Sequence, residues 1–348
     1  MRELIRPELR ELTAYDIPVR APGIWLNANE SPWDINEVMF VQNVNRYPEQ
    51  VTQLLLEQLC AIYQVQADQL LLTRGSDEGI DILVRLFCRP YQDEVIICPP
   101  TFGMYQQSVK LQGAKLVTVP LLVDKGFQWD LQKIKQSISS NTKMIFICSP
   151  NNPTGNVIPP EEILALLNFV NEKVLVVIDE AYIEFAQNES MTSYISQYSN
   201  LVILRTLSKA FGLADLRCGM VISQAPLIDM LQNLMPPYPF SAMTLKIINM
   251  ATSQHKLQQV NKNIALIKQQ REWMLSELGK LKCVDKIYSS EANFLLVMFK
   301  DATSVLESCQ QNNIYLRDFS AIPGLMNGIR ISIGLENQNQ QLLAVLKK

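Results

Sequence analysis

Histidine is almost absent from this sequence, because the 348 residues include a single one, His255. The Ser-His-Asp triads, the HExxH zinc sites and the metal centres that use several histidines are therefore excluded. The chain also lacks the string GxxxxGK[ST], the phosphate loop of P-loop ATPases. His255 lies between Gln254 and Lys256, and its usual interpretation is an exposed residue of a helix.

Cysteine pairs and long apolar runs are missing as well. The 7 cysteines are scattered without CxxC spacing, which is typical of reduced thiols in a cytosolic protein. Apolar runs such as 174–178 and 201–204 are far shorter than the roughly 18 residues that span a bilayer. The first residues, MRELIRPELREL, have no apolar signal core. We expect a cytoplasmic protein that is neither exported nor held in a membrane.

The charge is nearly balanced, with 31 basic and 34 acidic residues and a net charge of -3. Such a chain has no basic excess with which to bind nucleic acid, so small molecules are its expected ligands. Hydrophobic residues make up 48% and charged residues 19%, which indicates a globular protein. A length of 348 residues suits two domains.

Short β-rich runs alternate with helical patterns over about residues 70–225. The runs are at 95–98, 115–119, 144–148, 174–178, 201–204 and 219–223, and helical stretches include 78–87, 131–138 and 161–170. Buried strands separated by helices predict an α/β fold with a doubly wound, mostly parallel sheet. Ligands of such sheets bind beyond the carboxyl ends of the strands.

The pattern changes after Pro239. A long helical stretch at 241–278 precedes strand-like runs at 293–299, 314–316 and 329–333, with helical segments at 302–311 and 338–346. We expect a large domain at 46–240 and a small α+β domain at 241–348, with residues 1–45 as an arm that contributes to the small domain.

One lysine has polar neighbours in the sequence that indicate a catalytic role. Lys209 in RTLSKAFGLADLRCG (205–219) has Thr206 and Ser208 beside it, while Asp179 ends an apolar run and Tyr182 follows. Alone, a lysine is usually a surface charge. A Schiff-base lysine, an acid for a pyridinium nitrogen, a phenol and a phosphate cradle are together what pyridoxal 5′-phosphate (PLP) requires. We therefore predict PLP, with Lys209, Asp179 and Tyr182 as catalytic residues.

Two segments are candidates for the phosphate cradle. Thr206, Ser208 and Arg217 could hold the phosphate at a strand-to-helix turn. The segment Gly75-Ser76-Asp77 precedes an amphipathic helix and would present backbone N–H groups at the positive end of the helix dipole. An ordinary helix cap is the alternative for Asp77.

Three further side chains have both an ordinary and a functional interpretation. SPNNPTG (149–155) is a proline-rich turn in which Asn152 could donate to the phenolic oxygen of the cofactor. Tyr105 in PPTFGMY is either a core aromatic or a ring stacked on the cofactor. Arg330 in GIRISIG is either a surface cation or the two-pronged donor for a substrate anion. The apolar run that ends in Asp179 also resembles the magnesium-binding strand of P-loop ATPases, but the missing phosphate loop excludes that alternative.

With these motifs in this order, the chain resembles the fold-type-I PLP-dependent aminotransferases over nearly its whole length. LNANESP (26–32), NRYPE (45–49), RGSDEGI (74–80) and DEAYIEF (179–185) are most similar to the histidinol-phosphate aminotransferases. The resemblance implies a homodimer with shared active sites, in which Tyr47 reaches the cofactor phosphate of the partner subunit. Ser76 and Asp215 stand where the family commonly has small residues, and Asp215 adds a negative charge near Arg217.

The resemblance also implies the reaction, an exchange of the amino group between glutamate and imidazole acetol phosphate that yields 2-oxoglutarate and histidinol phosphate, or the reverse. Histidinol phosphate has no α-carboxylate, so one site must accept glutamate's carboxylate or the phosphate of the other substrate. Our hypothesis is that Arg330 serves both. Arg317, Tyr15 and Asn29 are the other expected substrate contacts.

Three alternatives remain open at this point. Threonine-phosphate decarboxylase is similar in sequence and binds a phosphorylated amine, and an aromatic-amino-acid aminotransferase is the second alternative. A non-catalytic PLP carrier is the third, although the intact Lys209 and the lack of an appended DNA-binding segment argue against it.

Overall fold

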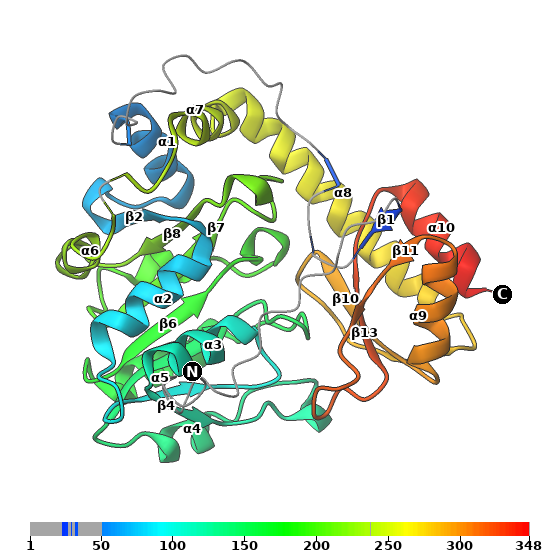
Figure 1. The fold of residues 1–348 in the computed structure, drawn as a ribbon, viewed down its shortest axis with the longest axis horizontal. Coiled ribbons are helices and arrows are strands. Elements are labelled where there is room, and N and C mark those ends of the chain that lie inside the picture. Colours follow the sequence, from blue (N-terminus) through cyan, green and yellow to red (C-terminus); the bar gives the residue numbers. More distant parts are fainter. Residues whose placement is uncertain (1–22, 27–28, 30–31, 34–50, 237, 348) are drawn as a thin grey trace, which may run out of the picture.

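The computed structural model describes residues 23–26, 29, 32–33, 51–236 and 238–347, so Tyr15 and Tyr47 lie outside the described residues (Figure 1). The strands are β1 (Ile24–Trp25), β2 (Leu70–Thr73), β3 (Glu94–Ile97), β4 (Lys115–Thr118), β5 (Thr142–Cys148), β6 (Leu175–Asp179), β7 (Leu201–Thr206), β8 (Gly219–Ile222), β9 (Val284–Ile287), β10 (Phe294–Phe299), β11 (Ile314–Tyr315), β12 (Arg317–Asp318) and β13 (Gly328–Ser332). The helices are α1 (Gln53–Tyr63), α2 (Gly75–Phe87), α3 (Gly103–Gln112), α4 (Leu131–Ser137), α5 (Pro160–Val170), α6 (Ala225–Gln232), α7 (Ala242–Ala251), α8 (Gln254–Leu278), α9 (Ala302–Gln311) and α10 (Glu336–Leu346).

A seven-stranded sheet in the order β2-β8-β7-β6-β5-β3-β4 forms the larger part of the molecule. Strands β7, β6, β5, β3 and β4 pair in parallel, and β8 is antiparallel to both of its neighbours. The predicted doubly wound, mostly parallel sheet is thus confirmed. Successive residues of each strand point to opposite faces, and both faces are covered by helices. Residues of α2, α3 and α6 pack on one face, and residues of α1, α4 and α5 pack on the other.

A four-stranded antiparallel sheet, β12-β13-β10-β9, lies beyond α8 near the C-terminus (Figure 1). A short segment from the start of the chain joins this region, because β1 pairs in parallel with β11 and Leu26 O accepts a hydrogen bond from Ser332 N at 3.0 Å. The smaller antiparallel region thus contains residues from both ends of the chain.

The long helical stretch predicted at 241–278 consists of two helices with a short break between them. Helix α7 ends at Ala251, and α8 begins at Gln254. Thr252 Oγ1 donates to Ile248 O at 2.8 Å, so its hydroxyl competes with the helical backbone at the break. Helix α8 then runs towards the small sheet (Figure 1), with Lys268 Nζ donating to Ala186 O and Arg271 Nη1 donating to Ala292 O.

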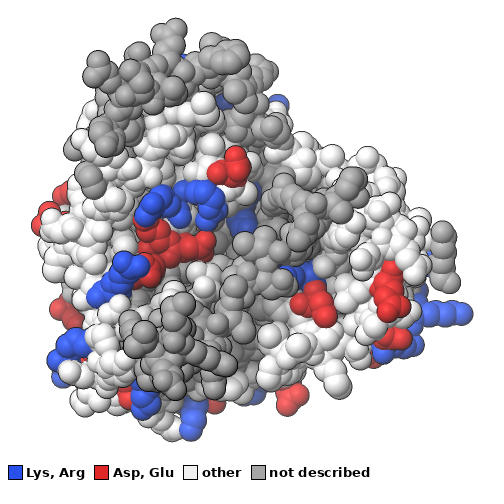
Figure 2. Space-filling model, in the orientation of Figure 1, with Lys and Arg blue, Asp and Glu red and all other residues white. Residues whose placement is uncertain are grey.

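On the face drawn in Figure 2, the described basic and acidic side chains lie side by side rather than in patches of one sign. Among the described residues, no helix combines the length and the apolar character needed to cross a membrane.

Candidate active site

Strands β5, β6 and β7 bring the predicted residues to one edge of the large sheet. The strands are parallel, and their register pairs Cys148 with Asp179 and Asp179 with Leu204. The segments that follow them, which contain Asn152, Tyr182 and Lys209, therefore leave the sheet at its carboxyl edge.

Asp179 is a buried carboxylate with only 2% of its surface exposed. It accepts hydrogen bonds from Tyr105 Oη at 2.7 Å and from Ala181 N at 3.1 Å. Burial raises the pKa of Asp179 to about 6, although these two hydrogen bonds act in the opposite direction. A cationic partner would stabilise the ionised carboxylate, and a protonated pyridine nitrogen is such a partner.

Tyr105 differs from its predicted role as a ring that stacks on the cofactor. Its side chain is fully buried, and its ring stacks on Phe146 with centroids 4.7 Å apart. Its position on α3 places the Tyr105 ring in the apolar layer on one face of the sheet. Only its hydroxyl group therefore reaches the site, where it donates to Asp179. One turn earlier, Phe102 is partly exposed and meets the Tyr105 ring edge-on at 5.7 Å. Phe102 belongs to the same PPTFGMY motif but was not predicted as a site residue.

Lys209 lies in the connection between β7 and β8 and is partly buried. Its Nζ is 5.8 Å from the centroid of the Tyr182 ring. The predicted strand-to-helix turn is wrong here, because β7 is followed by a loop and a short 3-10 turn, η7 (Ala214–Leu216). Tyr182 Oη accepts a hydrogen bond from Asn29 Nδ2 at 3.3 Å. Burial raises the pKa of Tyr182, whereas the charge of Arg330 and the bond from Asn29 lower it.

The first turn of α2 and the loop after β7 form a cradle with donors for an anion. The N-cap residue of α2, Arg74, makes no side-chain cap hydrogen bond, so the first N–H groups of α2 can bind a ligand. Thr206 Oγ1 lies 3.0 Å from Ser208 Oγ and accepts from Ser208 N at 3.1 Å. Hydroxyl groups, a helix N-terminus and a guanidinium are the donor set that a phosphate requires.

Arg217 supplies the guanidinium of this cradle. Its Nη2 lies 3.0 Å from Asp77 Oδ2. Gly75, with φ of +77°, leaves space for it, because a Cβ at that position would lie 2.6 Å from Arg217 Nη2. Asp215, in η7, is exposed. These residues fit the phosphate group of PLP.

Arg330 reaches the site from the small sheet. The side chain is buried, and its Nη1 donates to Asn152 Oδ1. This bond occupies the amide oxygen of Asn152 and leaves the amide nitrogen to donate elsewhere. The guanidinium carbon of Arg330 lies 5.2 Å from the Phe294 ring centroid and 5.5 Å from that of Phe319. Arg317 is the direct partner of Arg330 across the β12–β13 pair, so both side chains leave the same face of the sheet.

Asn29 links the small sheet to Tyr182. The residue is fully buried with φ of 53°, a left-handed conformation that asparagine tolerates. Its Oδ1 accepts from Ser332 Oγ at 2.6 Å, and its backbone carbonyl accepts from Asn293 Nδ2 at 2.9 Å. Ser332 and Asn293 were not predicted. Residues separated by more than 260 positions meet here, and only the tertiary fold brings them together.

A model of the aminotransferase class I and II family matches residues 25–346. This chain belongs to the class I and II aminotransferases. The aminotransferase is 42% identical to the histidinol-phosphate aminotransferase of Yersinia enterocolitica over 347 residues, 99% of this chain and 92% of the relative.

Two solved structures show the same fold. The histidinol-phosphate aminotransferase of Sinorhizobium meliloti, in complex with pyridoxal-5′-phosphate, has a TM-score of 0.82 and 20% identity, and the match covers 99% of this chain and 96% of that one. The L-threonine-O-3-phosphate decarboxylase of Porphyromonas gingivalis has a TM-score of 0.78 and 21% identity, with coverage of 93% and 98%.

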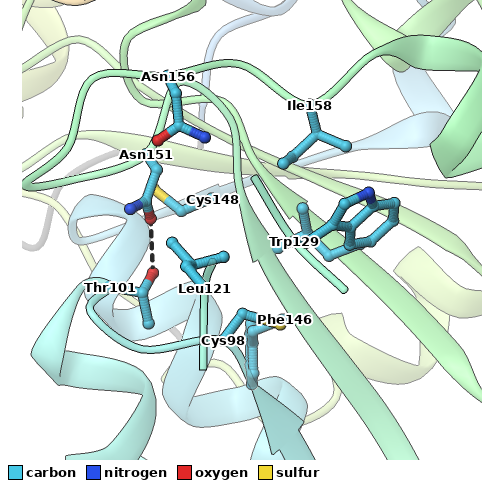
Figure 3. A pocket seen from close by; sticks show the side chains of 10 residues that line it. Cys98, Thr101, Leu121, Trp129, Phe146, Cys148, Asn151, Asn156 and Ile158 are labelled. Atoms are coloured by element: carbon cyan, nitrogen blue, oxygen red, sulfur yellow. Dashed lines mark hydrogen bonds between the residues drawn. The ribbon is translucent and has the colours of Figure 1, made fainter. Parts of the chain in front are cut away.

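A small cavity lies next to the turn that carries Asn152, and Thr101 and Asn151 are among the residues that line it. In Figure 3 the side chain of Asn151 points towards Thr101, whose Oγ1 donates to its Oδ1 at 2.8 Å. Asn151 Nδ2 also donates to Pro100 O at 2.9 Å. Adjacent asparagines of this aminotransferase therefore have different tasks, since Asn151 fixes the turn and Asn152 meets Arg330. In the part of the chain that the structure describes, no group of three His, Cys, Asp or Glu residues could hold a metal ion.

Proposed function

We propose that this aminotransferase exchanges an amino group between L-histidinol phosphate and 2-oxoglutarate, giving imidazole acetol phosphate and L-glutamate, or the reverse, in histidine biosynthesis. The observation that carries the proposal is the buried guanidinium of Arg330, which hydrogen-bonds to Asn152 at the same edge of the sheet as Asp179 and Lys209. The histidinol-phosphate aminotransferase that is 42% identical over 347 residues supports the choice of substrate.

The residues of the site fit PLP as the cofactor. When bound, PLP supplies an aldehyde for an amine and a ring that accepts electrons from the substrate Cα. Lys209 would hold the cofactor covalently, and Asp179 would keep its ring nitrogen protonated. Asn152 and Tyr182 would donate hydrogen bonds to its phenolic oxygen.

The phosphate of PLP would be bound by two groups of donors. One is the N-terminal turn of α2, from Gly75 to Asp77. The other comprises Thr206, Ser208 and Arg217. We assign the ring face to Phe102 instead of Tyr105, because Phe102 is partly exposed whereas Tyr105 is fully buried.

Lys209 would have a second role when it is not bonded to the cofactor. Its amine would then take the proton from the substrate Cα and return one, acting as general base and acid. The buried carboxylate of Asp179 favours this proton loss, because it stabilises the positive charge of the ring nitrogen while Cα is being deprotonated.

The pair Arg330 and Arg317 suits the anionic ends of both substrates. The register of β12 and β13 places the two guanidinium groups on one face of the small sheet. A guanidinium accepts a carboxylate or a phosphate in the same two-pronged manner. We therefore propose that Arg330 binds the carboxylate of glutamate and the phosphate of histidinol phosphate in turn, with Arg317 and Asn29 beside it.

We further propose that the enzyme is a cytoplasmic homodimer with the domain division given above and with Tyr47 completing the partner's site. All seven cysteines are free thiols, as a reducing compartment would leave them. Exposed apolar side chains on α1 and α7, which pack against each other, support an interface between two copies: Leu54 is 55% exposed, Met243 43% and Met250 38%.

A single-turnover experiment tests the reaction. PLP-loaded protein should lose its yellow colour on mixing with histidinol phosphate, release one equivalent of imidazole acetol phosphate, and regain the colour with 2-oxoglutarate. Release of carbon dioxide from threonine phosphate, or bleaching by aromatic amino acids but not by histidinol phosphate, would replace the proposal with one of its rivals. A protein that stays yellow with every amine would be a carrier.

A further inference from the structure

A cluster of buried charges lies on the face of the large sheet opposite the proposed site. Neighbouring residues of a strand point to opposite faces. Glu180 follows Asp179 and Arg205 precedes Thr206, so the side chains of Glu180 and Arg205 lie on the face opposite those of Asp179 and Thr206. Consistent with this alternation, Val177 and Leu204 belong to the apolar layer on one face, and Ile178 and Ile203 belong to the layer on the other.

Arg205 is at the centre of this cluster, with 9% of its side chain exposed. Its Nη1 lies 3.3 Å from Glu180 Oε2, and its Nη2 lies 2.8 Å from Glu184 Oε1. The guanidinium carbon lies 4.7 Å from the ring centroid of Tyr63, which belongs to α1. Glu180 is held independently, because it also accepts hydrogen bonds from Ser190 Oγ at 2.5 Å and from Met191 N at 2.7 Å.

The cluster begins where the backbone pairing of β6 with β7 ends. The last paired residues are Asp179 and Leu204, and one more backbone bond, from Glu180 N to Leu204 O at 2.9 Å, follows them. Beyond this point β7 pairs only with β8, through Thr206 and Gly219. After this ladder stops, the bridge from Arg205 to Glu180 and Glu184 links the two segments.

The composition of the cluster does not suit a purely stabilising role. Arg205 Nε, Glu184 Oε2 and Tyr63 Oη are buried and have no hydrogen-bond partner among the described residues, and a buried polar atom without a protein partner contributes less to stability than a paired one. Buried ion pairs can often be replaced by apolar residues without loss of stability. A role in fixing the distance between the two segments would explain why Arg205, Glu180 and Glu184 are charged residues.

We propose that Arg205 is a positioning residue, whose bridge to Glu180 and Glu184 sets the distance between Asp179 and the segment 206–209. It does so from the opposite face, without touching cofactor or substrate. This inference rests on the proposed use of Asp179 and Lys209 in PLP chemistry.

Two variants test the proposal, measured as PLP-loaded proteins. Arg205→Lys keeps the charge but cannot bridge two carboxylates in a fixed fork. Removing Arg205 alone would leave two buried carboxylates without their cation, so the second variant combines Arg205→Met with Glu180→Gln and Glu184→Gln. Asp93→Asn is the matched control, because Asp93 is a buried, ion-paired carboxylate that precedes β3, at the amino edge of the same sheet.

The readouts are the PLP dissociation constant and the pH titration of the visible absorbance, both recorded well below the melting temperature of each variant. We expect both Arg205 variants to bind PLP roughly tenfold to a hundredfold more weakly, which corresponds to the loss of one hydrogen bond to a charged group, and to shift the midpoint of the titration. Asp93→Asn should lower the melting temperature and leave both readouts unchanged.

Lower melting temperatures with unchanged PLP binding and an unchanged titration in the Arg205 variants would overturn the proposal. Failure of the proposed function would look different. In that case the unmodified protein itself would not bind PLP at Lys209, whereas a failed positioning role leaves the unmodified protein yellow and reactive with amines.

Discussion

Replacing Asp179 with asparagine should make the cofactor-free protein more stable at pH 8. Burial places the folded-state pKa of Asp179 at about 6, above the ordinary value of 3.8. A shift of about two units corresponds to about 3 kcal/mol of destabilisation by the ionised form. Asparagine has the shape of the protonated acid and carries no charge, so the variant avoids this cost.

The pH dependence follows from the sign of the shift. Because the pKa is raised on folding, the stability of the Asp179 protein is unaffected below pH 3.8, falls as the pH rises from 3.8 to about 6, and changes little above that value. The advantage of Asp179→Asn should therefore grow from about half a kcal/mol at pH 4 to about 3 kcal/mol at pH 8. Asp93→Asn supplies the opposite sign, because its ion pair with Arg89 lowers the pKa of Asp93 to about 2, and this variant should be less stable throughout the same range.

Urea unfolding of the cofactor-free proteins at several pH values between 4 and 8 measures these differences. An advantage that does not change with pH, or a variant less stable than the parent at pH 8, would refute the reasoning from burial. With PLP bound, the Asp179→Asn variant should be the less active of the two proteins, since it has no carboxylate for the ring nitrogen. Its turnover should then fall by at least about a hundredfold.

Three further substitutions test separate parts of the site. Gly75→Ala places a carbon 2.6 Å from Arg217 Nη2 and should weaken PLP binding by roughly tenfold, the loss of one charged hydrogen bond. Gly126→Ala, at a similar φ of +68° but with open space around it, should lower only the stability, and equal PLP binding in both variants would contradict the assignment. Arg330→Lys should slow the half-reactions with glutamate and with histidinol phosphate by roughly a hundredfold each; in stopped-flow measurements, a loss confined to one substrate would disprove the shared anion site. Asn29→Gly keeps the left-handed backbone but deletes an amide that forms buried hydrogen bonds, and urea unfolding should show a loss of about 2 kcal/mol, whereas unchanged stability would mean that this network contributes nothing.

The central strands, and the alternation of strands with helices, could be predicted because the apolar runs of these strands are bounded by polar residues. Strand β6 was predicted at 174–178 and lies at Leu175–Asp179. Strand β9 was missed because its residues are at most partly buried and include Asp285 and Lys286, so it carries no apolar signal. The break before α8 was missed because the sequence stays helix-compatible through Thr252 and Ser253.

The site residues that could be predicted are those whose motifs follow the end of a strand. Lys209, Asp179 and Asn152 follow apolar runs, and parallel pairing brings such ends together. The orientation of Tyr105 was not predictable, because one turn of α3 decides which of two aromatic side chains faces the core. Contacts such as that between Asn29 and Ser332 depend on the packing of segments from opposite ends of the chain.

The most direct test of the account is to find where PLP is attached. The PLP-loaded protein would be reduced with borohydride and digested, and its peptides would be mapped by mass spectrometry. We predict a pyridoxyl group on Lys209 and on no other lysine. A modified lysine elsewhere, or an unmodified chain, would contradict the account.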